Sequence, residues 1–353
     1  MTPSNYQLCI READPIADRE RIRSVLARNL PSAAPADRYE WLYLSNPCGR
    51  SLVWLAEEVD TGKPVGTSAA HRRRVRVNGR VVTALILGDS AIDPAYRFLG
   101  PALQLHRATL APVNEGRYAF SCDHPGPTML AVYRRLGYAE LGKMQRWVRL
   151  LQAIPVLKRR YGDRIGTKIL GAMSDFAIRI KDTAARLPRG LSVTFHQGQY
   201  GAEFDALAER LAGLRPIMGV RSANYLSWRY GRNPIWRHDT LCAWRGEQLV
   251  GYLIVRTVEP ETLSVVELLA VDDPEVWTGL AVELVALARS RGAVALTAEV
   301  LRGCVAATMF RKMGFLLRED GIGPVVYAQQ GSELAQVIYS IDNWWMVGGD
   351  RDA

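Results

Sequence analysis

The chain has 353 residues, a length that suits two domains of about 150 residues each. Its 48% hydrophobic and 23% charged residues are typical of a soluble globular protein, no apolar run approaches the roughly 20 residues of a membrane-spanning helix, and the N-terminus lacks a signal-peptide pattern. The net charge of +9 is compatible with three kinds of partner: nucleic acid, an anionic membrane surface or an anionic ligand.

The N-terminal part of the chain predicts two helices followed by antiparallel strands. Apolar residues at helical spacing indicate a helix over residues 15–29, and a shorter helix over 37–45 ends before an Asn-Pro pair. Strands are expected over 51–57 and 64–70. Next, Asn78-Gly79 stands between two β-branched runs, which is a strong signal for a two-residue hairpin turn.

A strand, a loop and a helix follow the hairpin. The apolar run 81–88 predicts a buried strand, residues 103–110 carry apolar residues at helical spacing, and Gly100 marks the turn between them. The start of such a helix collects free backbone N–H groups and the positive end of the helix dipole. We therefore expect an anion site there, suited to phosphate.

Three more elements complete this region. A short strand is expected over 118–122, a helix over 128–136 that ends at Gly137, and a strand region over 138–150. The predicted order is helix, helix, three antiparallel strands, helix, strand, helix, strand.

The segment 151–190 predicts a basic amphipathic helix. Residues 156–190 contain nine Lys or Arg against three Asp. One apolar stripe recurs at three- and four-residue steps: Ile165, Ile169, Met173, Phe176, Ile180, Ala184 and Leu187. We expect a connecting helix packed across two domains, while an interfacial helix on anionic lipid over 156–187 and a partner site remain open.

Sequence patterns then repeat. Residues 41–47 and 228–234 both read W-x-Y-x-x-N-P, and the run 133–138, YRRLGY, has a counterpart at 310–315, FRKMGF. The two pairs occur in the same order with similar offsets. This indicates a duplicated domain.

The loop before residue 103 resembles the pyrophosphate loop of the GNAT acyltransferases, which reads Gln/Arg-x-x-Gly-x-Gly/Ala. Arg97, Gly100 and Ala102 occupy its fixed positions, although Pro101 removes one N–H donor. The predicted order of elements also matches that family. The resemblance implies acetyl-coenzyme A, or another acyl-coenzyme A, as co-substrate. It assigns these residues to its binding: Ser90, Ile92, Arg97, Phe98, Leu99, Gly100, Ala102 and Leu103.

Two residues are candidates for catalysis, the first from the same resemblance and the second from its position in the sequence. Tyr133, four residues before Gly137, matches the tyrosine whose phenol protonates the departing thiolate, and its ordinary pKa near 10 keeps it protonated at neutral pH. Asp89, at the end of the strand over 81–88, could accept the amine proton directly or through water. The residues alone leave open that Tyr133 is a core aromatic and that Asp89 is an exposed acid at a strand end.

The second copy departs from the family pattern. Phe310 stands where the first copy has Tyr133, and a phenyl ring has no proton to donate. Asp272, Asp273 and Glu275 occupy the place of the phosphate loop and would repel a pyrophosphate. We therefore expect a non-catalytic second copy.

Together these patterns predict an α/β protein of two tandem GNAT-like domains, each a mixed, mostly antiparallel sheet flanked by helices. The expected divisions are 1–150 (acyltransferase), 151–190 (linker) and 191–353 (degenerate copy). The expected reaction is acyl transfer from coenzyme A to a primary amine of an unidentified acceptor, which is either a small molecule or attached to a polymer. A FemAB-like aminoacyltransferase and a non-catalytic coenzyme A-binding scaffold are the alternatives. Five scattered cysteines and five scattered histidines lack disulfide or zinc spacing, so we expect a cytoplasmic location, no metal and, given the coenzyme A loop, no nucleic acid.

Overall fold

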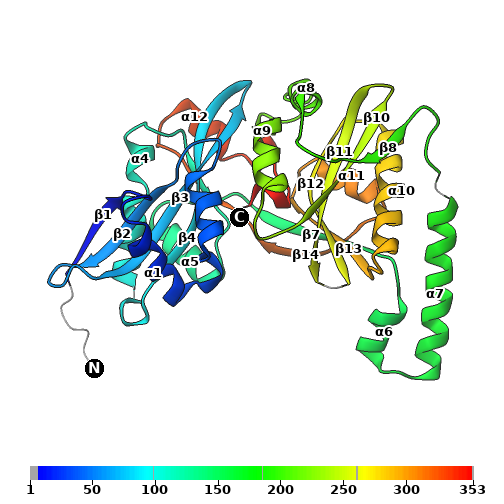
Figure 1. Cartoon of the computed structure of the whole chain (residues 1–353), viewed down its shortest axis with the longest axis horizontal. Coiled ribbons are helices and arrows are strands. Elements are labelled where there is room, and N and C mark those ends of the chain that lie inside the picture. Colours follow the sequence, from blue (N-terminus) through cyan, green and yellow to red (C-terminus); the bar gives the residue numbers. More distant parts are fainter. Residues whose placement is uncertain (1–6, 98, 185, 260, 352–353) are drawn as a thin grey trace.

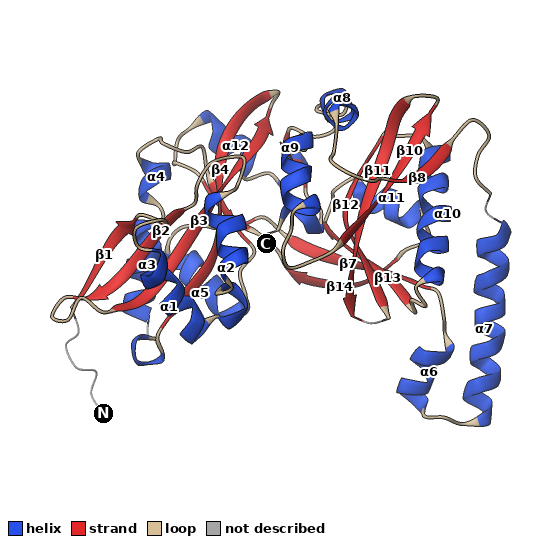
Figure 2. Cartoon of the chain, viewed as in Figure 1, coloured by secondary structure: helices blue, strands red, loops and turns tan. Residues whose placement is uncertain are grey.

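The computed structural model describes residues 7–97, 99–184, 186–259 and 261–351. The chain forms two halves side by side, each built on a sheet with helices against it (Figure 1). Most strand pairs in both sheets are antiparallel (Figure 2). The predicted fold class, α/β with two mixed and mostly antiparallel sheets, is confirmed.

The first sheet has the strand order β1-β2-β3-β4-β5-β15-β6, and β9 joins it beside β3 with β16 beside β9. Its strands are β1 (Leu8–Ala13), β2 (Leu52–Glu58), β3 (Pro64–Val77), β4 (Arg80–Ile92), β5 (Ser121–Asp123), β6 (Ala139–Glu140), β9 (Ile217–Gly219), β15 (Val325–Tyr327) and β16 (Trp344–Trp345). Its helices are α1 (Arg19–Asn29), α2 (Ala36–Tyr39), α3 (Leu99–Ala108), α4 (Ala111–Asn114) and α5 (Pro127–Arg135), with α12 (Glu333–Ile338) near the C-terminus. The expected turn at Asn78-Gly79 is confirmed, and both residues have positive φ.

The second sheet has the strand order β14-β7-β13-β12-β11-β10-β8. Its strands are β7 (Lys143–Leu150), β8 (Ser192–Phe195), β10 (His238–Arg245), β11 (Gln248–Glu259), β12 (Thr262–Ala270), β13 (Ala295–Leu301) and β14 (Leu316–Ile322). Its helices are α8 (Ala202–Arg210), α9 (Ala223–Leu226), α10 (Pro274–Ser290) and α11 (Ala306–Lys312). One parallel pair, β12 with β13, interrupts the antiparallel order of this sheet, whereas the first sheet has two, β4 with β5 and β9 with β16.

The halves exchange strands. We expected one strand region over 138–150 in the first sheet, and this was wrong: β6 stays there, while β7 lies between β13 and β14 of the second sheet. In the other direction, β15 returns to the first sheet and separates β5 from β6. The sheets therefore do not follow a division of the chain at residue 150.

The repeated motif folds the same way twice. In each copy a short helix runs into a π-helical turn, Glu40–Leu44 after α2 and Ser227–Gly231 after α9. The two turns meet where the halves meet: the indole rings of Trp41 and Trp228 stack 4.9 Å apart. Each indole N–H donates to the other residue's backbone oxygen, at 2.8 and 2.9 Å. This reciprocal contact joins the matched motifs.

The segment between the halves forms a helical hairpin, α6 (Ile154–Tyr161) and α7 (Ile165–Ala184), which projects from the second half away from the first (Figure 1). The expectation that α7 packs across both domains was wrong, because its apolar stripe is exposed over Ile165, Met173 and Phe176. None of the described helices is both long enough and apolar enough to cross a bilayer. All five cysteines are free thiols.

Candidate functional site

A cavity of about 570 Å³ opens beside β4 in the first half. Strand β4 pairs with the parallel strand β5 only at Leu85–Ser121 and Ile86–Cys122, so the two strands separate beyond Ile86. The helices α3 and α5 border the cavity. It is lined by Asn29, Ser90, Ala91, Ile92, Arg97, Leu99, Ala102, His106, Thr128, Met129, Ala131 and Val132. We call this space the β4 cavity.

The first turn of α3 faces the β4 cavity. The helix begins at Leu99, and both Leu99 and Ala102 contribute to the lining. Gly100 is exposed in the same turn, which leaves room for a ligand against the backbone. Free N–H groups and the positive end of the helix dipole make such a turn a binding site for anions. Of the remaining residues assigned to this loop, Leu103 packs against the core and Phe98 lies outside the described residues.

Arg97 extends along the same opening. Its Nε donates to the Ile92 backbone oxygen at 2.9 Å, and its Nη2 donates to the Asn29 side chain at 2.9 Å. No ion pair joins Arg97 to any residue in the described part of the chain. The guanidinium is exposed at the cavity, and its charge is available to an anion bound there.

A serine–histidine pair lies in the lining and was missed by the sequence reasoning. The Nε2 of His106, on α3, lies 2.8 Å from the hydroxyl of Ser90 on β4. Burial lowers the pKa of His106 to about 4, so the ring is neutral at pH 7. The pair ties the helix to the diverging strand. Helical spacing marked position 106, but nothing in the local sequence indicated its partner.

Tyr133 lies directly behind this pair. Its ring, 1% exposed, packs edge-on against His106 at 5.3 Å and against Tyr138 at 4.7 Å between centroids. The adjacent Val132 lines the β4 cavity. Tyr133 is therefore buried within the core one residue from the lining, and its catalytic role stays a prediction.

Asp89 has a different environment. Both of its carboxylate oxygens accept from Arg38, at 2.7 and 3.0 Å, and one also accepts from the Tyr43 hydroxyl at 2.8 Å. The side chains of Arg38 and Asp89 are only 6% and 7% exposed. The residue does not line the β4 cavity, although its strand neighbours Ser90 and Ala91 do. Its role as general base stays a prediction, and both of its carboxylate oxygens are already engaged by Arg38.

The second half contains a matching buried cluster. The Glu267 carboxylate accepts from Arg221 at 3.0 Å and from the Tyr230 hydroxyl at 3.3 Å. Tyr43 and Tyr230 are the equivalent tyrosines of the repeated motif. Burial raises the pKa of Glu267. Each half thus buries an acid that accepts from the motif tyrosine and from an arginine, although the arginine lies within α2 in the first half and before α9 in the second.

The start of α10, the counterpart of α3, is already occupied. The Asp273 side chain caps the helix by accepting from the Glu275 backbone N–H at 2.8 Å. Both acids also pair with Arg245, at 2.7 and 2.8 Å. A phosphate would meet two carboxylates there. Phe310, the counterpart of Tyr133, is buried against Phe315.

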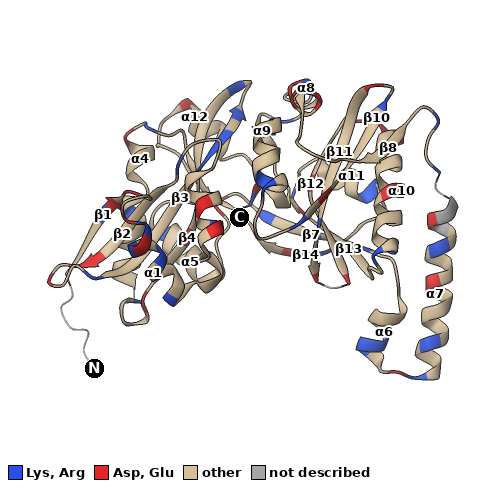
Figure 3. Cartoon of the chain, viewed as in Figure 1, with Lys and Arg blue, Asp and Glu red and all other residues tan. Residues whose placement is uncertain are grey.

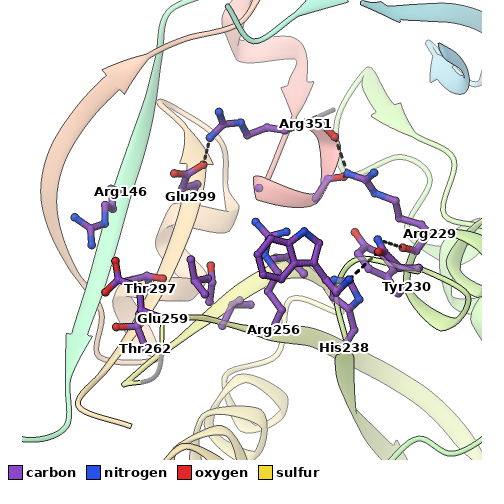
Figure 4. Close-up of a pocket in the computed structure, with 18 residues that line it drawn as sticks. Arg146, Arg229, Tyr230, His238, Arg256, Glu259, Thr262, Thr297, Glu299 and Arg351 are labelled. Carbon is purple, nitrogen blue, oxygen red and sulfur yellow. Dashed lines mark hydrogen bonds and ion pairs between the residues drawn. The ribbon is translucent and has the colours of Figure 1, made fainter. Parts of the chain in front are cut away.

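A second cavity, of about 400 Å³, opens in the second half between β11, β12, β13 and the chain just before the C-terminus. Figure 4 shows its lining, in which arginines surround an aromatic wall. The charged and aromatic residues of this lining include Arg146, Arg229, Trp236, His238, Arg256, Glu259, Glu299 and Arg351. We call it the basic pocket. In the described part of the chain, no group of three or more acidic, histidine or cysteine side chains is arranged to hold a metal ion.

Comparison with known proteins identifies the first half. Residues 19–141 match the family model described as the acetyltransferase (GNAT) domain, which confirms the resemblance seen in the sequence. No curated protein sequence matches the chain. A probable N-acyltransferase of unknown function from Enterococcus faecalis V583 superposes with a TM-score of 0.64 at 13% identity, over 91% of this chain and 73% of that chain.

Two further solved structures have a similar fold. A GCN5-related N-acetyltransferase from Anabaena variabilis gives a TM-score of 0.62 at 14% identity, over 91% of this chain and 72% of that chain. The N-myristoyltransferase of Saccharomyces cerevisiae, solved with bound myristoyl-coenzyme A, gives 0.54 at 11% identity, over 92% and 83%. At these identities the superpositions establish the fold alone. They extend over both halves of the chain.

Proposed function

Because residues 19–141 form a GNAT acetyltransferase domain, we propose that the protein is an N-acyltransferase that moves an acetyl or other acyl group from coenzyme A to a primary amine. One observation carries the proposal: the β4 cavity lies where β4 and β5 separate and where the first turn of α3 opens. The GNAT resemblance implies that the acyl thioester lies in such a gap between strands, and a helix start of this kind favours a pyrophosphate.

Acyl-coenzyme A fits the residues that line the β4 cavity. Arg97 and the backbone of the first turn of α3 would hold the pyrophosphate, because they combine a cation with free N–H groups. The pantetheine arm would lie along Ser90 and Ile92, because β4 pairs with β5 only as far as Ile86. Leu99, Gly100 and Ala102 would supply small or apolar contacts to the same ligand.

Tyr133 is the proposed general acid. Its neighbour Val132 lines the β4 cavity, and its ring contacts His106, which also lines the cavity. The phenol would donate its proton to the thiolate that leaves when the amine attacks the thioester carbon. The neutral ring of His106, bonded to Ser90, would fix the position of this aromatic wall.

The general base is less constrained. Asp89 would accept the amine proton only by exchanging part of its bonding to Arg38, which makes direct proton transfer unfavourable. We therefore propose that the ion pair of Asp89 chiefly fixes the position of α2 against β4. We further propose that water carries the amine proton out of the cavity.

The second half is proposed to be non-catalytic. Its support is the capping acid Asp273 at the start of α10 and the phenylalanine at position 310. The duplication and the division of the sequence into 1–150, 151–190 and 191–353 are likewise proposals, supported by the two equivalent π-helical turns, although β7 and β15 each join the sheet of the other division. The cytoplasmic location inferred from cysteine usage stays a prediction.

Two measurements test the proposal. Calorimetric titration with coenzyme A should give one site per chain, and incubation of acetyl-coenzyme A with a panel of amines should release free thiol. Two equal sites would contradict the asymmetry between α3 and α10. Binding without thiol release from any amine would favour the non-catalytic scaffold. Transfer of the aminoacyl group from aminoacyl-tRNA to an amine, with release of free tRNA and no thiol, would favour the FemAB-like alternative.

A further inference from the structure

The basic pocket carries a positive charge that the protein itself leaves uncompensated. Arg351 pairs with Glu299 at 2.6 Å, and Arg146 pairs with Glu319 at 3.0 Å, so these two guanidinium groups already have carboxylate partners. Arg256 differs from them. Across the described residues, no carboxylate forms an ion pair with it.

Arg256 is also held in place. Its guanidinium lies 4.7 Å from the centroid of the Trp236 ring, an arrangement that fixes its orientation by a cation–π contact. Burial and the nearby charge of Arg229 lower the pKa of Arg256, which shows that the protein destabilises this cation. Burial together with the same two arginines lowers the pKa of His238 to about 4, so the histidine is neutral and adds no charge.

Glu259, the remaining acid of the basic pocket, does not neutralise the charge of Arg256. Glu259 is exposed and lies across the pocket from His238 (Figure 4). A ligand oxyanion placed at Arg256 would therefore supply the negative charge that the fold omits. Arginine binds carboxylate and phosphate through paired hydrogen bonds, and partial burial strengthens them.

The basic pocket adjoins the first half. Arg229 and Arg351 line it and also line a small hollow whose other wall includes His71 and Ile86 of the first sheet. Ile86 forms the last rung between β4 and β5, and Ser90 on the same strand reaches the β4 cavity. The small hollow thus connects the basic pocket to β4, the strand that also lines the β4 cavity.

We propose that the basic pocket binds the carboxylate or phosphate group of the amine acceptor, with Arg256 as the central contact. The proposal rests on the proposed N-acyltransferase function. It narrows the acceptor to an amine that also carries an oxyanion.

Matched amines test it. β-Alanine is compared with ethylamine, and O-phosphoethanolamine with ethanolamine, in the thiol-release assay. In Arg256→Gln, KM for the member of a pair that carries the carboxylate or phosphate should rise by about 10–100-fold, the usual cost of a lost charged hydrogen bond, while KM for the member without it stays unchanged. A KM change confined to the β-alanine pair would indicate a carboxylate ligand, and one confined to the O-phosphoethanolamine pair would indicate a phosphate ligand. Arg80→Gln, an exposed arginine in the β3–β4 hairpin, is the control and should change neither.

A second readout does not depend on turnover. At constant ionic strength, inorganic phosphate or acetate should raise the melting temperature of the wild type and of Arg80→Gln but not of Arg256→Gln. Equal protection of all three proteins, or equal KM changes within a pair, would overturn the proposal. Absence of thiol release from every amine would instead contradict the proposed function, because anion protection measures the pocket without catalysis.

A different observation concerns the α6–α7 hairpin. In its long helix, α7, the apolar residues face solvent and the small or polar residues face the protein. The side of α7 that contacts the protein is mostly small or polar: Thr167, Gly171, Ser174, Asp175, Ile178 and Asp182. A Cβ at Gly171 would lie 2.7 Å from Ile154, so α6 packs closely there. Asp182 pairs with Arg149 and Arg289 at 2.6 and 2.5 Å. These contacts fix the orientation of the helix.

The apolar side of α7 consequently faces solvent. At 100° per residue, the positions 165, 169, 173, 176 and 180 share one side, opposite the contacting side. Ile165, Met173 and Phe176 are 78%, 66% and 67% exposed. An apolar stripe of this length on a fixed helix marks an interaction surface.

The charges around the stripe select the partner. Lys and Arg lie on α6, while α7 carries Lys and Arg interspersed with Asp (Figure 3), and residues 156–190 contain nine Lys or Arg against three Asp. A second copy would bring two such cationic hairpins together, which is unfavourable. An anionic bilayer surface neutralises the cations and takes up the apolar side chains at once.

We propose that the α6–α7 hairpin docks the protein on anionic phospholipid, with the apolar stripe in the interface. Cosedimentation of the full chain with vesicles tests this. Vesicles containing phosphatidylserine should retain the wild type, more strongly at low salt, and pure phosphatidylcholine vesicles should not. Replacing Lys158, Arg159 and Arg160 by Gln should weaken the partition coefficient by about 10–100-fold.

Apolar variants complete the test. Phe176→Asp should abolish retention, whereas Val59→Asp, at an equally solvent-facing valine of the first half, should retain the wild-type value. Both variants should keep the wild-type melting temperature, since both positions are exposed. Equal retention by both kinds of vesicle, or equal loss in both variants, would overturn the proposal. A dimer in sedimentation that Phe176→Asp dissociates, without vesicle binding by the wild type, would assign the stripe to self-association.

Discussion

Replacing Asp89 by Asn separates a structural from a catalytic role for this acid. The substitution removes one charge from a pair whose side chains are 6% and 7% exposed, and it leaves the Arg38 guanidinium buried without its counter-ion. Breaking such a pair from one side typically costs about 3–5 kcal/mol. The backbone adds nothing to this cost, because Asp89 has a φ of 48° and asparagine tolerates that left-handed conformation.

The assay is thermal and denaturant unfolding of the wild type, Asp89→Asn, and the double variant Arg38→Met/Asp89→Leu. We expect the single variant to melt lower by on the order of 5–15 °C. The double variant should regain part of the loss, because it buries no unpaired charge. It also places a leucine at positive φ, so recovery should be incomplete.

One result would refute this reasoning. If Asp89→Asn melted like the wild type yet lost acyl transfer by a factor of about 10² or more, the ion pair would be of little structural value and the carboxylate would act as the base. Unchanged stability together with unchanged activity would show that neither role applies.

Three further outcomes are expected from the first half. Tyr133→Phe should lower turnover by about 10²–10⁴-fold with nearly unchanged affinity for acyl-coenzyme A, since only the proton donor is lost. Phe310→Tyr should create no activity. If Tyr133→Phe kept the wild-type turnover under conditions where chemistry limits the rate, Tyr133 would have no part in the mechanism. Gly100→Glu should abolish coenzyme A binding in calorimetry by placing a carboxylate beside the phosphates, and wild-type affinity in that variant would move the phosphates elsewhere. Because burial lowers the pKa of His106 to about 4, the unfolded state binds its proton first on acidification, so the melting temperature should fall from pH 6.5 toward 4; His106→Gln should reduce that slope, and an identical slope would contradict it.

Local patterns predicted most elements because the signals lie in adjacent residues. The turn at Asn78-Gly79 and the helix start near Gly100 follow from backbone preferences that a few residues determine. The repeated motif predicted a duplication, and both copies form the same π-helical turn. The reciprocal contact of Trp41 and Trp228 needed the structure, because a motif does not specify what it faces.

Two expectations failed for a shared reason. The periodicity of a strand or helix does not specify which other element it packs against. The strand region 138–150 has the composition of one strand, but Gly142, with φ of 131°, redirects the chain and β7 joins the other sheet. The stripe of α7 was expected to be buried, yet the ion pairs of Asp182 orient the helix the opposite way. Acidic residues on the face opposite the stripe were visible in the sequence, but their distant partners were not.

The candidate site was predicted in part. Arg97 and the start of α3 border the β4 cavity as expected, because a loop motif keeps its residues together. The ion pair of Asp89 with Arg38 joins residues 51 positions apart, and the contact of Ser90 with His106 joins two elements. The basic pocket assembles arginines from residue 146 to residue 351, so no local pattern could reveal it.

The position of β15 between β5 and β6 determines when the first sheet can be completed. A ribosome that adds about 5–20 residues per second needs on the order of 10–40 s to extend the chain from β6 to β15. During that interval β5 and β6 both have an unpaired edge, which is a template for unwanted strand pairing. Meanwhile β7 must avoid the nearby first sheet until β13 and β14 exist. The first sheet of the nascent chain is therefore completed only when β15, near the end of the chain, has been made. Newly made molecules should be more vulnerable to aggregation than fully folded ones.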